Sequence, residues 1–223
     1  MKFVTYPDRE ALMLSLADQI ASELSEALNR TGSAAFSVPG GTTPGPIFDI
    51  LSGVHLDWAN VAVFLNDERW VDETSPRSNT RLLRERLLVG SAAKASLIPL
   101  YARSAMPEDQ MEALAAGLQP HLPITVLLLG MGADMHTASL FPGADLLKEA
   151  LAPDAPILLP MRAEAAGEPR ITLSARVLQD ALNIHVLITG REKKAAIQRA
   201  LTLPVIDAPI RSILDNATIH WAE

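Results

Sequence analysis

Residues 124–136 have the sequence ITVLLLGMGADMH, in which an unbroken apolar run gives way to a glycine-rich turn that ends in histidine. A short apolar run without polar alternation is typical of a strand buried on both faces of a parallel sheet. We therefore expect a central strand over residues 124–129. The turn that follows lies where open α/β sheets bind ligands, beyond the carboxyl end of a strand.

The segments on either side alternate between short apolar runs and longer helical runs. Leucine or isoleucine recurs every four residues between Leu12 and Leu28, which predicts a helix over 8–29. Further strands are expected at 3–6, 34–38, 61–65, 97–100, 171–173, 185–189 and 218–221. Further helices are expected from residue 44 through 51 and at 80–88, 107–118, 175–181 and 191–201. Residues 143–169 are predicted to be mostly loop, with one short helix and one short strand.

This alternation predicts an α/β fold with a doubly wound, mostly parallel sheet flanked by helices. No internal repeat, low-complexity tract or linker is visible, so residues 1–223 are predicted to form a single domain. The composition is 48% hydrophobic and 20% charged, which is typical of a packed globular chain and not of a disordered one.

Charge and composition exclude several functional classes. The formal net charge of −7 gives no bulk attraction to nucleic acid or to an anionic membrane. The absence of cysteine excludes disulfides, thiolate catalysis and cysteine-bound metals. The sequence contains neither a signal-peptide pattern nor a run of about 18 apolar residues. We therefore expect a cytoplasmic protein without nucleic-acid or membrane partners.

Three polar turns follow predicted strands, at residues 39–44, 66–69 and 130–136, and they should converge at one edge of the sheet. In the first, Gly40 and Gly41 allow a sharp turn, and Thr42 or Thr43 can cap the next helix. Free N–H groups at a helix start bind anions, so this turn is a candidate phosphate site. An ordinary strand–helix connection is the alternative.

The second turn contains Asp67, Glu68 and Arg69. Arg69 could face a substrate anion or a developing oxyanion while the acidic residues hold it by charge-assisted hydrogen bonds. A solvent-exposed salt bridge is the alternative.

The third turn places His136 after a buried strand, where an imidazole can take a proton from water at neutral pH. Asp134, two residues earlier, could orient the ring and stabilise the imidazolium. A metal ligand, a capping histidine and a core histidine are the alternatives. No His-x-x-x-His pair accompanies His136, and Ser139 is not in a Gly-x-Ser-x-Gly turn. We therefore expect neither a metal site nor a serine nucleophile.

Two cations follow later in the chain, Arg170 before a short strand and Lys193 at the start of a helix. The helix dipole disfavours a cation at a helix start, so Lys193 is better explained if an anionic ligand joins it. Exposed lysines are nevertheless common at such positions.

Taken in order, these motifs resemble those of 6-phosphogluconolactonases. The resemblance covers nearly the whole chain and rests on short matches in a fixed order: GGTTP at 40–44, DER at 67–69 with SN at 78–79, GxGxDxHTASLFP at 130–142, RITL at 170–173 and GxxK at 190–193. Two positions depart from the family pattern. Met135 stands where the family usually has glycine, and Pro39 stands where it often has serine. A side chain at 135 could change the turn if positive φ is needed.

The resemblance implies a Rossmann-like fold shared with sugar-phosphate isomerases and deaminases. It implies hydrolysis of 6-phospho-D-glucono-1,5-lactone to 6-phosphogluconate in the pentose phosphate pathway, by a carboxylic ester hydrolase without metal or cofactor. In that family the histidine matching His136 activates water. Arg69 and Lys193 match cationic substrate-binding positions, and residues 40–43 match a phosphate-facing loop; Arg170 joins this predicted substrate site.

Two other functions compete with the lactonase. Hexosamine-6-phosphate deaminases and isomerases typically have a sequence like Asp-Glu-Tyr in the second turn, where this chain has Arg69 in the third position. They end the histidine motif in Phe-Asn-Glu-Pro, where this chain has Ser139-Leu140-Phe141-Pro142. A non-catalytic sugar-phosphate sensor would keep the pocket without turnover, but His136 and Asp134 are both retained. The expected partner is a small phosphorylated sugar lactone, and the expected state is a monomer.

Overall fold

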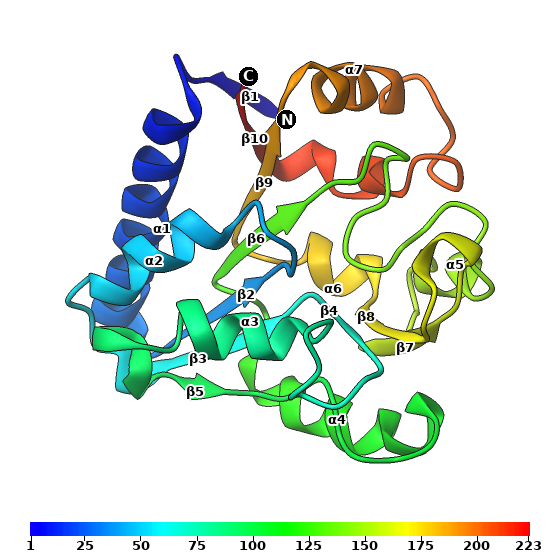
Figure 1. The fold of residues 1–223 in the computed structure, drawn as a ribbon, viewed down its shortest axis with the longest axis horizontal. Coiled ribbons are helices and arrows are strands. Elements are labelled where there is room, and N and C mark those ends of the chain that lie inside the picture. Colours follow the sequence, from blue (N-terminus) through cyan, green and yellow to red (C-terminus); the bar gives the residue numbers. More distant parts are fainter.

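A computed structural model describes all 223 residues and contains two sheets (Figure 1). The main sheet has seven parallel strands in the order β1-β10-β9-β6-β2-β3-β5. The second sheet has three antiparallel strands in the order β4-β8-β7. The strands are β1 (Lys2–Thr5), β2 (Ala34–Val38), β3 (Val61–Leu65), β4 (Asp67–Arg69), β5 (Ser96–Leu97), β6 (Val126–Gly130), β7 (Leu158–Met161), β8 (Arg170–Leu173), β9 (Asn183–Thr189) and β10 (Ala217–Ala222).

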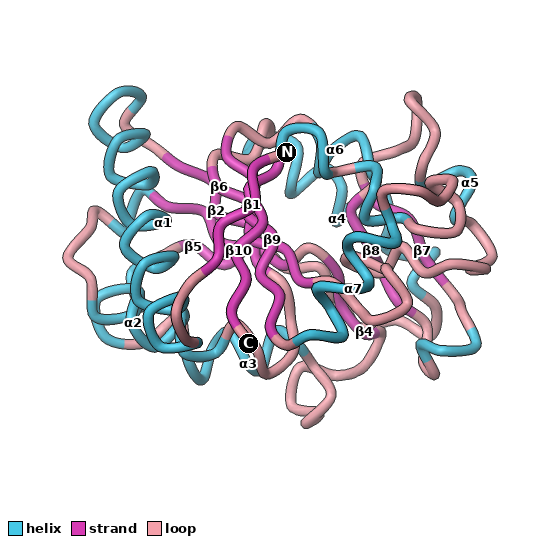
Figure 2. Tube along the Cα trace, turned by 90° about the horizontal axis from the view of Figure 1, so that it is seen from above, coloured by secondary structure: helices cyan, strands magenta, loops and turns pink.

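Helices cover both faces of the main sheet. They are α1 (Arg9–Thr31), α2 (Gly45–Gly53), α3 (Asn79–Arg86), α4 (Met111–Leu118), α5 (Leu147–Ala150), α6 (Ala175–Gln179) and α7 (Arg191–Ala200), joined by short 3₁₀ turns. Figure 2 shows α1 and α2 on one side of the sheet, with α6, α7 and the second sheet on the other. The predicted mostly parallel, helix-flanked sheet is confirmed. None of the helices has the length and apolar character needed to cross a membrane.

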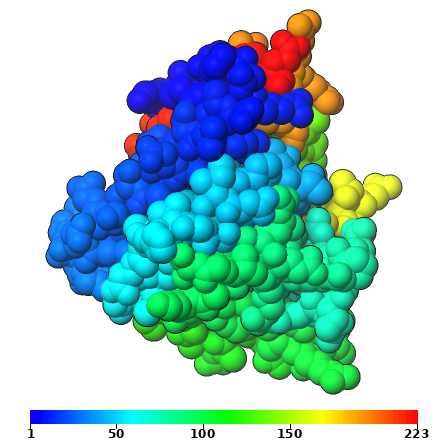
Figure 3. Space-filling model, turned by 60° about the vertical axis from the view of Figure 1, so that its left-hand side comes forward, coloured from blue at the N-terminus to red at the C-terminus, as the bar shows by residue number.

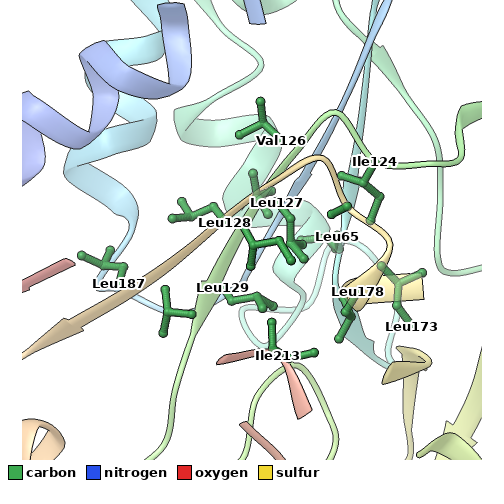
Figure 4. Close-up of a cluster of buried hydrophobic side chains, with 14 of the residues drawn as sticks. Leu65, Ile124, Val126, Leu127, Leu128, Leu129, Leu173, Leu178, Leu187 and Ile213 are labelled. Atoms are coloured by element: carbon green, nitrogen blue, oxygen red, sulfur yellow. The ribbon is translucent and has the colours of Figure 1, made fainter. Parts of the chain in front are cut away.

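The apolar run at 126–129 forms the middle strand of the main sheet, as predicted. β6 lies between β9 and β2, and its residues Val126–Leu129 are completely buried. Successive side chains of a strand point to opposite faces, so an unbroken apolar run fills the core on both sides at once. Figure 4 shows these side chains in one cluster of buried residues that also includes Leu173 of the second sheet and Leu178 of α6.

Helix α1 follows from the four-residue spacing of its leucines. Leu12, Leu16 and Leu24 are completely buried against the sheet. Asp8 caps the first turn by accepting a hydrogen bond from the Ala11 N–H at 2.8 Å, and Gly32 ends the helix at φ +79°. Figure 3 shows this helix beside α2.

The strand order places the ligand-binding edge. From β2 the chain passes through α2 to β3 on one side, whereas from β6 it continues to β9 and β10 on the other side. The connections therefore diverge between β2 and β6. In open α/β sheets the crevice at such a switch point, beyond the carboxyl ends of the strands, is where ligands bind.

The second sheet was not expected as a separate sheet. Residues 67–69 were predicted to be a turn, but they pair with β8 in antiparallel fashion. Strands of three or four residues are too short to show a periodic pattern, so their pairing depends on tertiary contacts. Two other boundaries also differ: the strand predicted at 97–100 is only Ser96–Leu97, and the helix predicted at 107–118 begins with a 3₁₀ turn at Pro107–Gln110.

A chain of hydrogen bonds runs through the buried histidines of β9 and β10. Glu23 Oε2 meets His185 Nε2 at 2.7 Å, His185 Nδ1 meets His220 Nε2 at 3.0 Å, and His220 Nδ1 meets the Tyr6 hydroxyl at 2.8 Å. Every ring nitrogen therefore has a partner while both rings are neutral. Burial, reinforced by His185 and Lys2, lowers the pKa of His220 from 6.5 to about 3.

We expect this network to make the fold sensitive to acid. The unfolded chain takes up a proton on His220 near pH 6.5, whereas the folded chain does so only near pH 3. The free energy of unfolding therefore falls as the pH drops through this window, by about 1–2 kcal/mol between pH 7 and pH 5. Urea unfolding at both values should show a flatter pH dependence for His220→Gln. The exposed His55→Gln variant is the control, and equal slopes for His220→Gln and the parent protein would contradict this assignment.

Candidate active site

A cavity of about 340 Å³ lies at this edge of the main sheet and is lined by residues of all three predicted turns. The lining includes seven of the predicted site residues: Gly40, Gly41, Thr43, Arg69, His136, Arg170 and Lys193. Asp134 reaches the cavity only through its contact with His136. Thr42 does not line it. Its exposed side chain lies in a neighbouring depression with Met13 and Ile50, because the chain turns at Gly41, where φ is +84°.

His136 and Asp134 form a close pair beyond the carboxyl end of β6. The distance from His136 Nδ1 to Asp134 Oδ1 is 2.5 Å, and the His136 N–H donates to the same oxygen at 3.2 Å. The hydrogen bond from His136 lowers the pKa of Asp134 despite partial burial, so the carboxylate stays ionised. Because Nδ1 is engaged, Nε2 is the nitrogen left to accept a proton. The ring packs against Phe141, with the centroids 4.3 Å apart.

Gly132 makes room for this pair. A Cβ atom at Gly132 would lie 2.2 Å from His136 Nδ1 and 2.3 Å from Asp134 Oδ1, far inside contact distance. The Gly132 N–H donates to the His136 carbonyl at 3.0 Å, and the Gly132 carbonyl accepts from the Met135 N–H at 3.0 Å. The turn therefore folds back on itself, with the imidazole and the carboxylate packed against the glycine.

Met135 has the left-handed backbone conformation that glycine would adopt without cost, with φ at +68°. The suspected need for positive φ at this position is thus real, and methionine meets it under strain. Two contacts hold it there. Its side chain is only 7% exposed, and its carbonyl accepts a hydrogen bond from the Ile210 N–H at 3.1 Å.

Two arginines lie side by side on neighbouring strands of the second sheet. Arg69 of β4 and Arg170 of β8 are directly paired in register, and both line the cavity. Like charges at paired positions destabilise a sheet, and a buried donor without a partner costs free energy. Both Nε atoms are nevertheless buried and have no hydrogen-bond partner. Burial lowers the pKa of Arg170, against the opposing effect of Asp67, whose Oδ2 is 3.8 Å from Nη1. The pair therefore concentrates positive charge at the cavity wall.

Lys193 is the third cation of the cavity. It lies in the first turn of α7, and its ammonium group donates a hydrogen bond to the Met131 carbonyl. Burial lowers the pKa of Lys193, whereas the charges of Asp134 and Glu192 act to raise it. Lys193 therefore lies on the same side of the cavity as the His136 pair, at a helix start where an anionic ligand would stabilise it.

The 40–43 turn differs from its predicted helix-capping role. Neither threonine side chain caps α2; Pro44 is the N-cap residue, and only the Thr42 carbonyl is used, by the Gly45 N–H at 3.2 Å. That prediction was wrong, because the helix begins at Gly45, one residue later than the motif suggests. Gly40 has a different reason to be glycine: a Cβ atom there would lie 2.0 Å from Asn79 Oδ1.

Glu68 is a structural residue, for which the sequence left open either a role in holding Arg69 or a surface salt bridge. It is completely buried and accepts four hydrogen bonds: from the N–H groups of Arg69, Asn79 and Thr80 and from the Ser78 hydroxyl, at 2.7–3.0 Å. The carboxylate therefore fixes Arg69 and the start of α3 together. The sequence signal for this role was the Ser78-Asn79 pair downstream of the DER motif.

Two further cavity residues were missed as site residues. Asp67 is buried, accepts a hydrogen bond from the Ser139 hydroxyl at 2.5 Å and faces Arg170. Asn79 is held by its amide, which donates to the Asp67 carbonyl at 3.1 Å, and it also lines the cavity. No three His, Asp or Glu side chains anywhere in the chain are grouped so that they could hold a metal ion.

Comparison with known proteins shows the family to which the chain belongs. The family described as glucosamine-6-phosphate isomerases/6-phosphogluconolactonase matches residues 7–221. The 6-phosphogluconolactonase of Mesorhizobium japonicum is 41% identical over 97% of this chain and 93% of its own length. That of Rhizobium meliloti is 40% identical over 97% of both chains.

A solved structure extends the similarity to three dimensions. The crystal structure of a 6-phosphogluconolactonase from Shewanella baltica superposes with a TM-score of 0.96 at 34% identity, over 100% of this chain and 98% of that one. Both the sequence similarity and this superposition span the site and the fold together. The chain therefore belongs to the glucosamine-6-phosphate isomerase/6-phosphogluconolactonase family.

Proposed function

We propose that the protein hydrolyses 6-phospho-D-glucono-1,5-lactone to 6-phosphogluconate, the step that a 6-phosphogluconolactonase performs in the pentose phosphate pathway. The observation that carries this proposal is the His136–Asp134 pair, which faces a cavity that also holds Arg69, Arg170 and Lys193. A phosphorylated lactone needs both parts: a base beside its ester carbon and cations for its phosphate. The named relatives support the same reaction.

In the proposed reaction, His136 Nε2 takes a proton from water as the water oxygen attacks the lactone carbonyl carbon. Asp134 stabilises the imidazolium that forms, and a cavity cation stabilises the oxyanion of the tetrahedral intermediate. The ring C–O bond then breaks. The imidazolium returns its proton to the departing ring oxygen, which becomes a hydroxyl, and the carbonyl carbon becomes a carboxylic acid that ionises.

The phosphate is placed at the far end of the cavity from His136. Backbone N–H groups of the 40–43 turn lie at the start of α2, where the helix dipole favours an anion. The guanidinium groups of Arg69 and Arg170 and the ammonium of Lys193, which all line the cavity, provide the charge that the phosphate and the oxyanion share.

One residue favours the lactonase over a deaminase of the same family. Arg69 takes the position where the deaminase motif has tyrosine, and it lines the cavity. A cation there suits ester hydrolysis of an anionic substrate. A sensor without turnover would differ in function and not in pocket, so only an assay separates it from the enzyme.

The test is a lactonase assay on freshly prepared substrate, with spontaneous hydrolysis subtracted, in the presence and absence of a chelator. We expect turnover above the spontaneous rate, equal in both conditions. Activity that the chelator removes would contradict the metal-free mechanism, and no turnover at all would favour the sensor.

Loss of a cavity cation should weaken substrate use. We expect Lys193→Ala to lower kcat/KM by about 10- to 100-fold, because a charged hydrogen bond to the substrate is worth about 1.5–3 kcal/mol. Arg69→Ala should lower kcat/KM as well. The matched control is Lys194→Ala, because Lys194 lies over the Trp221 ring at 3.8 Å and not in the cavity. Steady-state kinetics checks this. Normal kcat/KM in both cavity variants would move the phosphate site elsewhere.

We further propose that residues 1–223 act as one domain and as a monomer, in the cytoplasm and without nucleic acid. One continuous cluster of 63 buried apolar residues supports the single domain. The net charge of −7 disfavours nucleic acid. A phosphate dianion does not cross a bilayer unaided, which favours an enzyme in the compartment where sugar phosphates are made.

A further inference from the structure

An ion pair joins the two loops beside the cavity arginines. The loop at 70–78 follows β4, and the loop at 162–169 precedes β8. Arg77 Nε and Nη2 donate to the two carboxylate oxygens of Glu168 at 2.8 and 2.9 Å. This two-pronged geometry is the strongest form of an arginine–carboxylate contact. Arg77 is 58% exposed and Glu168 is 19% exposed, and neither lines the cavity.

Each of these loops is also hydrogen-bonded to one of the arginines. Arg69 Nη1 donates to the Arg77 carbonyl at 2.5 Å, and Arg170 Nη2 donates to the Ala166 carbonyl at 3.0 Å. The Trp70 N–H donates to the Pro169 carbonyl at 2.8 Å, which ties the two loops at their base. The position of each loop therefore fixes one end of a guanidinium whose Nε is unpaired.

The groups around Glu168 keep its carboxylate ionised. Burial acts to raise the pKa of Glu168, but hydrogen bonds from Arg77 and its own backbone, with the charges of Arg170 and Arg77, hold it below its ordinary value. The carboxylate is therefore ionised at neutral pH, as the ion pair requires.

We propose that Arg77 and Glu168 are positioning residues, whose ion pair holds the two loops so that the guanidinium groups of Arg69 and Arg170 keep their positions in the cavity wall, where they meet the anionic group of the substrate. This inference rests on the proposed function, in which those arginines bind that anion. Without the pair, each loop can move with its carbonyl, and the guanidinium bonded to it loses a fixed orientation. Binding then pays the entropy of ordering both arginines.

The test measures binding of the reaction product, 6-phosphogluconate, by titration calorimetry. The variants are Arg77→Ala, Glu168→Ala and the double variant. We expect Kd to rise about threefold to fivefold in each single variant, which is the upper range for an exposed ion pair with good geometry. The double variant should show the same rise and not the product of the two, since both changes remove one interaction. The control is Arg84→Ala, which removes an exposed ion pair with Glu73 from the same region.

Kinetics and thermal unfolding separate positioning from stability. We expect the single variants to raise KM by a similar factor, with kcat within about twofold of the parent protein and Tm close to that of Arg84→Ala. A Kd unchanged from the control, or effects that multiply in the double variant, would overturn the positioning role while leaving the proposed function intact. A parent protein that does not bind 6-phosphogluconate would overturn both.

Discussion

His136→Ala should lower kcat for 6-phospho-D-glucono-1,5-lactone by about 10²–10⁴-fold, the range over which a positioned general base accelerates a reaction. The ring is the only proton acceptor that the structure holds by a carboxylate at the carboxyl end of β6, with Nδ1 engaged and Nε2 free. Its side chain is 30% exposed and serves no core contact beyond Phe141, so its removal should leave the fold intact.

The control for this variant is His55→Ala, since His55 is an exposed loop histidine that does not line the cavity. Circular dichroism and Tm establish that the variant is folded, and the spontaneous hydrolysis rate is subtracted from every trace. Turnover equal to that of the parent protein would end the role of His136 as the base.

Gly132→Ala should be nearly as damaging, although it removes no functional group. The added methyl group would lie 2.2 Å from His136 Nδ1 and 2.3 Å from Asp134 Oδ1, so the two side chains must separate or leave their positions. A displacement of about 1 Å in a catalytic group can cost about 10²-fold in rate. We therefore expect kcat to fall by about 10²–10³-fold, with a smaller change in KM.

The matched control is Gly117→Ala, in helix α4. A Cβ atom there meets only Ile98 at an ordinary 3.9 Å, and alanine is the better helix former. It should keep the parent kcat and equal or higher stability. If Gly132→Ala also kept the parent kcat, the close packing of His136 and Asp134 against the glycine would not matter for the reaction.

The fold was largely predictable because its long elements carry periodic signals. The apolar run at 126–129 and the leucine spacing of α1 are patterns within a short stretch of sequence, and most of the apolar residues of both are buried. The second sheet was not predictable in this way. Its strands β4, β8 and β7 are three to four residues long, too short to show a periodic pattern.

Most of the charged residues that line the cavity could be predicted from the sequence. The buried residues that hold them in place could not. His136, Arg69 and Lys193 were found because charged groups after strand ends are conspicuous. The buried carboxylates of Glu68 and Asp67 were not separated from a surface pair, because sequence does not show which acid accepts hydrogen bonds from a helix start. Thr42 was included because a motif does not reveal the direction in which its side chains point.

Met135 shows how far a motif can be trusted. Its departure from glycine raised doubt about the turn, and the backbone does adopt positive φ there. The turn survives because burial of the methionine side chain and the hydrogen bond from Ile210 offset a strain of about 1–2 kcal/mol. Neither contact is visible in sequence.

The most direct test of the site is a crystal structure with 6-phosphogluconate bound. The phosphate should lie against the 40–43 turn with at least one cavity cation, and a carboxylate oxygen, the position that the attacking water takes, should lie within about 2.6–3.2 Å of His136 Nε2. A product bound outside this cavity, or bound with its phosphate beside His136 and its carboxylate at the 40–43 turn, would contradict the convergence of the three turns on one lactone.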